Sequence, residues 1–139
     1  MKIVVDTNII FSALLRKKSK IRDVLLESKN LSFYSCNFIF VELFKHKEKL
    51  LKLAHNREEI LTSLEVILKR ITLINEETIS LFSRRRAYEF VKDVDLKDLP
   101  FVALALELDA FLWTGDKKLQ KKLEKKGFNN FFILKEILK

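Results

Sequence analysis

The chain has 139 residues, of which 48% are hydrophobic and 33% are charged, a balance that favours a packed core and excludes a disordered segment. Its net charge of +8 suits a polyanionic partner such as nucleic acid, but a surface tuned for solubility or a Lys-rich thermophile surface would carry the same charge. Because the chain has one Cys, no signal peptide and no apolar stretch long enough to cross a bilayer, we expect a cytoplasmic protein without membrane contact and with one domain, residues 1–139.

Strands and helices are predicted in alternation along this chain. In chain order these are a strand at 2–6, a helix capped by Asn8 and ending at Leu15, a helix from Lys20 to about Lys29, a strand at 31–35, a helix from Asn37 to about Ala54, a helix at 57–70, a strand at 71–74, a helix from Glu76 to about Val91, a helix at 100–108, a strand at 110–113, a helix capped by Asp116 and ending at Gly127, and a last apolar strand at 131–134. This alternation predicts a three-layer α/β/α fold with a central parallel sheet of four to five strands and right-handed crossovers.

Four carboxylates occur at the edges of these predicted elements. Asp6 ends the first strand, and Asp116 follows the strand at 110–113. Asp98 precedes an apolar helix, and Glu42 borders the apolar face of the helix that begins at Asn37. Because ligands of parallel sheets collect at the carboxyl ends of the strands, we expect these four acids to meet there.

Clustered carboxylates repel one another unless a cation lies between them. Magnesium prefers oxygen ligands and needs only one or two direct carboxylates, so the four acids fit one or two such ions. The two histidines, His46 and His55, lack partners at zinc-site spacing, and no Gly-rich phosphate loop is present. The acids are therefore the coherent catalytic set, suited to metal-assisted hydrolysis of a phosphodiester.

Two short motifs frame this set, Asp6-Thr7-Asn8 at the front and Thr114-Gly115-Asp116 at the rear. Together with Glu42 and Asp98 they resemble the PIN-domain family of magnesium-dependent ribonucleases, over nearly the whole chain. The resemblance implies an endoribonuclease that uses Mg²⁺ or Mn²⁺ to cleave RNA. It makes Asp6, Glu42, Asp98 and Asp116 the catalytic and metal-binding quartet, with Asp6 and Asp98 as direct ligands, Asn8 and Thr114 as polar supports, and Asp95 as an auxiliary or a competitor of Asp98.

In size and layout the chain is similar to the VapC-like toxin ribonucleases of this family. That similarity implies a small antitoxin protein that blocks the site, and a homodimer. Three alternatives stay open: housekeeping RNA processing, a catalytically silent RNA-binding or scaffold protein, and a metal-dependent enzyme acting on DNA or on another phosphoester.

Each acid also has an ordinary structural interpretation. Taken singly, Asp98 and Asp116 are best explained as helix caps, each contributing about 1 kcal/mol. Asp6 can serve a turn, and Glu42 can pair with Lys45, His46 or Lys49.

Basic residues near the predicted loops are candidates for RNA contact. The candidates are Arg16, Lys17, Arg84, Arg85 and Lys117. Arginines 84–86 cannot all face one way on a helix. The six lysines between 117 and 126 favour a solvated helix face anchored by Leu119 and Leu123.

Overall fold

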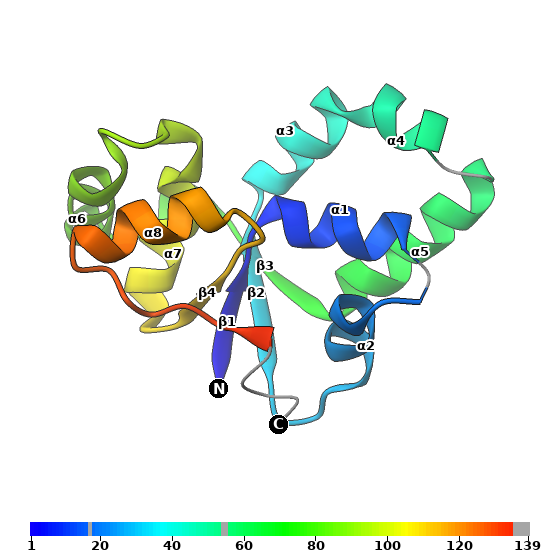
Figure 1. Cartoon of the computed structure of the whole chain (residues 1–139), viewed down its shortest axis with the longest axis horizontal. Coiled ribbons are helices and arrows are strands. Elements are labelled where there is room, and N and C mark those ends of the chain that lie inside the picture. Colours follow the sequence, from blue (N-terminus) through cyan, green and yellow to red (C-terminus); the bar gives the residue numbers. More distant parts are fainter. Residues whose placement is uncertain (17, 54–55, 135–139) are drawn as a thin grey trace.

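The structure is a computed structural model that describes residues 1–16, 18–53 and 56–134. Its centre is a parallel sheet of four strands, β1 (Lys2–Val5), β2 (Ser32–Cys36), β3 (Ile71–Ile74) and β4 (Phe111–Trp113), in the order β3-β2-β1-β4 (Figure 1). The β-branched and aromatic runs that predicted these strands lie inside the molecule, as is usual for a parallel sheet covered on both faces. The expected sheet is therefore confirmed.

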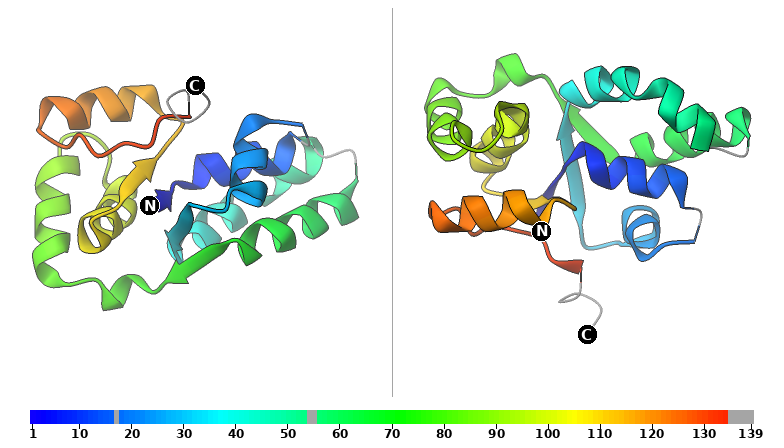
Figure 2. Two further views of the ribbon diagram at one scale, coloured as in Figure 1. Left: turned by 90° about the horizontal axis from the view of Figure 1, so that it is seen from below. Right: turned by 45° about the horizontal axis from the view of Figure 1, so that its top comes forward.

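Helices cover both faces of this sheet. One face carries α1 (Thr7–Leu15), α2 (Lys20–Glu27), α3 (Phe38–Lys45), α4 (Lys47–Leu53) and α5 (Arg57–Lys69), and the other carries α6 (Leu81–Val91), α7 (Leu99–Leu108) and α8 (Lys117–Lys125) (Figures 1 and 2). The chain steps from β1 to β2 to β3 in one direction and then returns past them to β4. Because crossovers between parallel strands are right-handed, the reversal of direction places the later helices on the opposite face.

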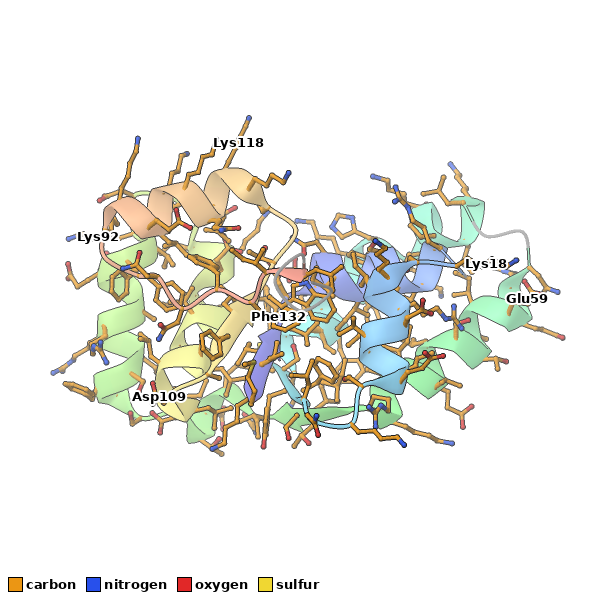
Figure 3. All side chains as sticks on the ribbon, turned by 60° about the horizontal axis from the view of Figure 1, so that its bottom comes forward. Lys18, Glu59, Lys92, Asp109, Lys118 and Phe132 are labelled. Carbon is orange, nitrogen blue, oxygen red and sulfur yellow. The ribbon has the colours of Figure 1, made fainter. Side chains whose placement is uncertain are left out.

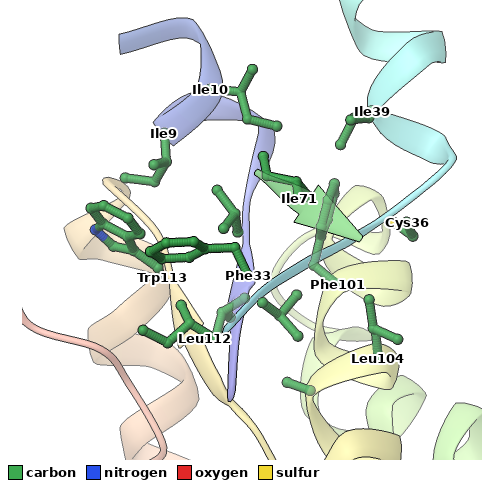
Figure 4. Close-up of a cluster of buried hydrophobic side chains, with 14 of the residues drawn as sticks. Ile9, Ile10, Phe33, Cys36, Ile39, Ile71, Phe101, Leu104, Leu112 and Trp113 are labelled. Carbon is green, nitrogen blue, oxygen red and sulfur yellow. The ribbon is translucent and has the colours of Figure 1, made fainter. Parts of the chain in front are cut away.

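The core lies on both sides of β1 and joins the layers. Residues Ile3, Val4 and Val5 are fully buried, and Phe101 to Ala105 of α7 are all buried as well. Helix α7 contacts β1, β2 and β4, which explains why its sequence is apolar almost all round. On the other side of the sheet Phe33 lies 6.0 Å from Trp113, measured between ring centroids, with Ile9 and Ile10 of α1 nearby (Figure 4).

The predicted fifth strand at 131–134 is wrong. Only Phe131 pairs with the sheet, through a single parallel bridge to Leu112. A second pair would need β4 to continue, but β4 ends at Trp113 and Thr114 turns away from the sheet edge. Two backbone hydrogen bonds hold the segment to Leu112, one from the Leu112 N–H to the Asn130 carbonyl at 2.8 Å and one from the Phe132 N–H to the Leu112 carbonyl at 2.9 Å. Aromatic contacts add to them, with the rings of Phe132 and Trp113 4.9 Å apart.

Two predicted helices are divided in the structure. The helix expected from Asn37 breaks at His46, whose backbone (φ −103°, ψ 13°) leaves the helical region. The break lets α3 and α4 each pack against α1; the expected end at Ala54 falls outside the described residues. The helix expected from Glu76 begins as a 3₁₀ turn, η1 (Glu76–Thr78), and α6 starts afresh because the Ser80 hydroxyl accepts the Ser83 N–H at 3.2 Å.

Within the described ranges, no helix is long and apolar enough to cross a membrane.

Candidate metal centre

The predicted acids lie where the direction of the sheet reverses. Strands β1 and β4 are neighbours, but β1 leads to α1 on one face and β4 leads to α8 on the other. The two strand ends are joined by a hydrogen bond from the Asp6 N–H to the Trp113 carbonyl, 3.0 Å long. Open α/β sheets bind ligands at such a switch point, so its position alone makes this edge the candidate site.

Asp6 is buried at the centre of this edge, with 6% of its surface exposed. Its Oδ1 accepts the Thr7 N–H at 2.7 Å, and its Oδ2 accepts the Thr114 hydroxyl at 2.8 Å and the Asn8 side-chain amide at 3.3 Å. Burial raises the pKa of Asp6 to about 6, against the lowering effect of the bonds from Thr114 and Thr7. Asp6, rather than the expected Asn8, is the N-cap of α1, because its carboxylate reaches the first free amide.

A polar network holds the front and rear motifs together. The Asn8 side chain donates to the Thr114 hydroxyl at 3.3 Å and accepts the Gly115 N–H at 3.0 Å. The Thr114 hydroxyl also accepts the Asp116 N–H at 3.1 Å. The predicted positions of Asn8 and Thr114 beside Asp6 are thus what the structure shows, and both orient groups around that carboxylate.

Glu42 reaches the site from α3 through a contact that the sequence did not predict. The Thr7 hydroxyl, which is buried, donates to Glu42 Oε1 at 2.7 Å. None of the ion pairs among the described residues involves Glu42, so the expected alternative of a surface pair is not formed. In the sequence, only the position of Thr7 between Asp6 and Asn8 indicated a role in the site. A buried Thr is just as common in a hydrophobic core, so its residue type alone indicated nothing.

Asp98 ends the 3₁₀ turn η2 (Leu96–Asp98) and occupies the N-cap position of α7, but its side chain makes no capping hydrogen bond. Burial is the main cause that raises the pKa of Asp98 to about 7, and the charges of Asp6, Asp95, Asp116 and Glu42 add to it. The ordinary interpretation of Asp98 as a cap is therefore wrong. Its half-buried carboxylate lies within electrostatic reach of all the other acids.

Asp95 and Asp116 are exposed and both act as caps. The Asp95 carboxylate accepts the Lys97 N–H at 3.0 Å, at the start of η2. Asp116 Oδ1 accepts the Leu119 N–H at 3.1 Å, so the expected capping of α8 is confirmed. A carboxylate with one capped oxygen keeps a second oxygen for another partner.

The donor set fits a hard divalent cation held through few direct bonds. All the side-chain donors are oxygens, and Asp6 and Asp98 lack a cationic partner among the described ion pairs. In the part of the chain that the structure describes, no three His, Cys, Asp or Glu side chains form a ready-made metal cage. A magnesium ion needs only one or two carboxylates and keeps several waters, which suits acids that are near one another without touching.

The predicted RNA-contacting residues are spread apart. Lys117 follows Asp116 directly, whereas Arg16 lies at the far end of α1, about 14 Å along the helix. Arg84 on the outer helix α6 donates to the Glu76 carbonyl at 2.8 Å, and Arg85 is exposed on the same helix. Lys17 lies outside the described residues. Among the described candidates, Lys117 is next to Asp116 in the chain, and Arg84 lines a hollow with Leu99 and Pro100, which follow Asp98.

Comparisons with known proteins agree with this geometry. A chain in the structure of VapBC2 from Rickettsia felis, bound to a DNA fragment from the promoter, is similar with a TM-score of 0.67 and 19% identity, over 87% of this chain and 92% of that chain. A chain in the structure of VapBC-1 from nontypeable Haemophilus influenzae is similar with a TM-score of 0.63 and 19% identity, over 90% of this chain and 94% of that chain. No curated protein sequence matches the chain. Residues 4–128 match the PIN domain, and the chain therefore belongs to the PIN-domain family.

Proposed function

We propose that the protein is a Mg²⁺- or Mn²⁺-dependent endoribonuclease and the toxin of a toxin–antitoxin pair. One observation carries the catalytic part of the proposal. Carboxylates from four separate segments gather at the switch point of the sheet, and two of them, Asp6 and Asp98, are buried enough for their pKa values to rise to about 6 and about 7. Such an arrangement destabilises the free protein and becomes favourable when a cation binds.

Each residue has a role that its contacts support. Asp6 and Asp98 would hold the ion directly, since both are partly desolvated and have no cationic partner among the described ion pairs. Glu42 and Asp116 would accept hydrogen bonds from its waters. A bound divalent ion would supply an activated water and stabilise charge on the phosphate and the leaving oxygen.

The polar residues around the acids orient them. Thr7 fixes the Glu42 carboxylate, and Thr114 and Asn8 fix the Oδ2 of Asp6. These bonds and the Thr7 N–H use three of the about four acceptor positions of the Asp6 carboxylate, which leaves one on Oδ1 for an ion. Polar supports of this kind commonly decide metal affinity as strongly as the ligands themselves.

The direct test is cleavage of RNA by the purified protein. We expect turnover with Mg²⁺ or Mn²⁺, none with EDTA, and turnover reduced by about 10²-fold or more for Asp6→Asn or Asp98→Asn. Parallel assays on single-stranded DNA and on mononucleotides separate a ribonuclease from a general phosphoesterase. Activity that survives EDTA and both substitutions would disprove the mechanism.

The lack of a ready-made three-acid group among the described residues also supports a second candidate, an RNA-binding protein without turnover. Calorimetry with Mg²⁺ distinguishes the two. The ribonuclease should bind the ion with an affinity that Asp98→Asn weakens. Tight RNA binding without metal binding or cleavage would favour the second candidate.

The toxin role rests on the two VapBC structures and on apolar surface that suits a protein partner. Along the second half of α1, away from Asp6, a hollow of about 220 Å³ faces α4. Helix α3 also exposes apolar side chains, such as Phe44 at 78%. The hollow is lined by Phe11, Leu15, His46, Lys49, Leu50 and Leu53.

Co-expression tests the toxin role. A small protein encoded beside this chain should form a complex with it and suppress the RNA cleavage, and the chain alone should slow growth. Light scattering on the isolated chain should show a homodimer. Growth unaffected by the active enzyme would favour housekeeping RNA processing.

A further inference from the structure

The basic charge of the protein is concentrated in and just after one helix. Between residues 117 and 126 there are six Lys and one Glu, which is a net +5 out of the +8 of the whole chain. The other 129 residues together carry only +3. A surface tuned for solubility would spread its positive charge over the molecule, so solubility does not explain why the lysines cluster on one helix.

The lysines of α8 form one outward face. Leu119 and Leu123 are buried and hold the helix against the molecule. At 3.6 residues per turn, the lysines fall into two adjacent rows within an arc of about 140° opposite these leucines. Figure 3 shows Lys118 pointing away from the body of the protein. The rows consist of Lys117, Lys121 and Lys125, and of Lys118 and Lys122; these five residues are the α8 lysine face.

The α8 lysine face has no internal compensation. In the part of the chain that the structure describes, Lys126 beyond the helix is the member of the run that forms an ion pair, with Asp93 at 3.0 Å. Like charges four residues apart destabilise a helix. Lys117 and Lys118 also occupy the first turn, where the helix dipole disfavours cations. Lys122 and Lys125 lie in the last turn, where the dipole favours cations, so the cost comes from the like-charge pairs and from the first turn. A bound polyanion would remove that repulsion.

This face begins at the candidate metal centre. Asp116 caps α8, and Gly115 just before it donates to Asn8 at 3.0 Å (Figure 1 shows the first turn of α8 beside the start of α1). From Lys117 to Lys125 the helix is about 12 Å long. A nucleic-acid strand with the duplex spacing of 3.4 Å carries about three phosphates over that length.

We propose that the α8 lysine face is the phosphate-binding surface that guides the RNA strand to the acids. This inference rests on the ribonuclease proposed above and specifies the path of its substrate. The strand lies along α8 with its backbone against the two lysine rows and passes Asp116 to reach Asp6 and Asp98. Binding is electrostatic, so α8 sets affinity and the reach of the strand, and does not select the base sequence.

The experiment compares two triple variants of equal charge. Lys117→Gln, Lys121→Gln and Lys125→Gln remove one row of the face. The matched control replaces Lys2, Lys20 and Lys29, all exposed and all outside α8, in the same way. Binding of a 12-nucleotide single-stranded RNA is measured by fluorescence anisotropy with EDTA present, from 50 to 300 mM salt.

We expect the α8 variant to weaken binding about tenfold to hundredfold at 50 mM salt and to reduce the slope of log K against log[salt] by about 2. The control variant should keep the wild-type slope. In cleavage assays the α8 variant should raise KM and leave kcat at saturating RNA unchanged. Replacement of the same three lysines by Arg should restore both binding and KM.

Thermal unfolding gives a readout that does not depend on activity. The α8 triple Gln variant should have a higher Tm than the wild type without RNA, because repulsion is removed. The 12-nucleotide RNA should raise the Tm of the wild type more than that of the variant.

Equal losses in both triple variants would overturn the inference, since net charge alone would then explain binding; so would unchanged binding in the α8 variant. If the wild type binds RNA through α8 but does not cleave it, the proposed ribonuclease is wrong, and the α8 lysine face stands as an RNA-binding surface alone. If it cleaves RNA and the α8 variant has an unchanged KM, the inference is wrong and the ribonuclease stands.

Discussion

Asp93 and Asp98 are five residues apart in one acidic run, and the fold treats them in opposite ways. Asp93 is exposed and bonded to Lys126 at 3.0 Å, and that bond lowers its pKa. Asp98 is half-buried, makes no capping bond, and has its pKa raised to about 7 by burial and by four neighbouring acids. Lys126 neutralises the charge of Asp93, whereas Asp98 has no cationic partner among the described ion pairs.

The contrast shows where the protein is stabilised and where it stores unfavourable charge. A carboxylate with a lysine beside it needs nothing more, whereas a group of carboxylates in a partly desolvated edge needs a cation or protons. Functional sites commonly sacrifice stability in this way.

The largest expected effect is on catalysis. Asp98→Asn should lower kcat/KM for RNA by about 10²-fold to 10³-fold, because loss of the proposed metal ligand would remove several kcal/mol of transition-state stabilisation. Asp93→Asn is the matched control and should keep wild-type activity. Equal losses in both variants, with both correctly folded by circular dichroism, would remove the distinction.

The next effect concerns stability against pH. The unfolded chain titrates near 3.8 at both Asp6 and Asp98, whereas the folded protein holds these protons up to about pH 6 and pH 7. The folded state therefore binds more protons across this window, and stability without metal should fall as pH rises from about 4 to about 7. For Asp6, which is 6% exposed, the rise in pKa corresponds to about 3 kcal/mol.

Thermal unfolding in EDTA measures this dependence. Asp98→Asn should reduce the loss of stability with pH, so that its Tm exceeds that of the wild type at pH 8 and equals it near pH 4. Mg²⁺ should raise the wild-type Tm at pH 8 more than at pH 5. A Tm that rises steadily from pH 4 to pH 7 in EDTA would contradict the pKa values of the buried acids.

A smaller effect is expected from Thr114→Val. The variant loses the hydroxyl that donates to Asp6 at 2.8 Å and accepts the Asp116 N–H, which we expect to destabilise the fold by about 1 kcal/mol. Because that bond lowers the pKa of Asp6, its loss should move the acid limb of the activity profile to higher pH. Thr72→Val on β3, which is exposed, should shift neither the limb nor the stability.

The smallest effect is expected at the paired acid. Lys126→Gln removes the partner of Asp93, whose side chain is 68% exposed, and such pairs contribute little. The variant also loses the bond from Lys126 Nζ to the Glu89 carbonyl at 3.1 Å. Urea unfolding should give the same midpoint as the wild type. A clear loss of stability would mean that this pair fastens the end of α8 to the molecule.

The sequence predicted most of the fold because local signals and burial agreed. The run Ile3-Val4-Val5 could only be a buried strand, and Pro100 marked the first turn of α7. The sequence-based predictions were wrong where a contact between distant parts of the chain competed with a local sequence pattern. The strand expected at 131–134 lost its partner when Thr114 turned toward Asp6, and the helix from Asn37 broke at His46 so that both halves could pack on α1.

For the acids too, the sequence determined some features and the tertiary structure determined others. The sequence determined their number, their chemistry and their positions at the edges of elements, since strand ends and helix starts are set by local propensity. It selected Asp98 but left Asp95 as an auxiliary or a competitor, because capping, ion pairing and ligation use the same carboxylate. Only the tertiary structure shows which carboxylate is buried without a partner and which is bonded to one. The strand order that brings β4 beside β1 and the burial of each side chain decide this.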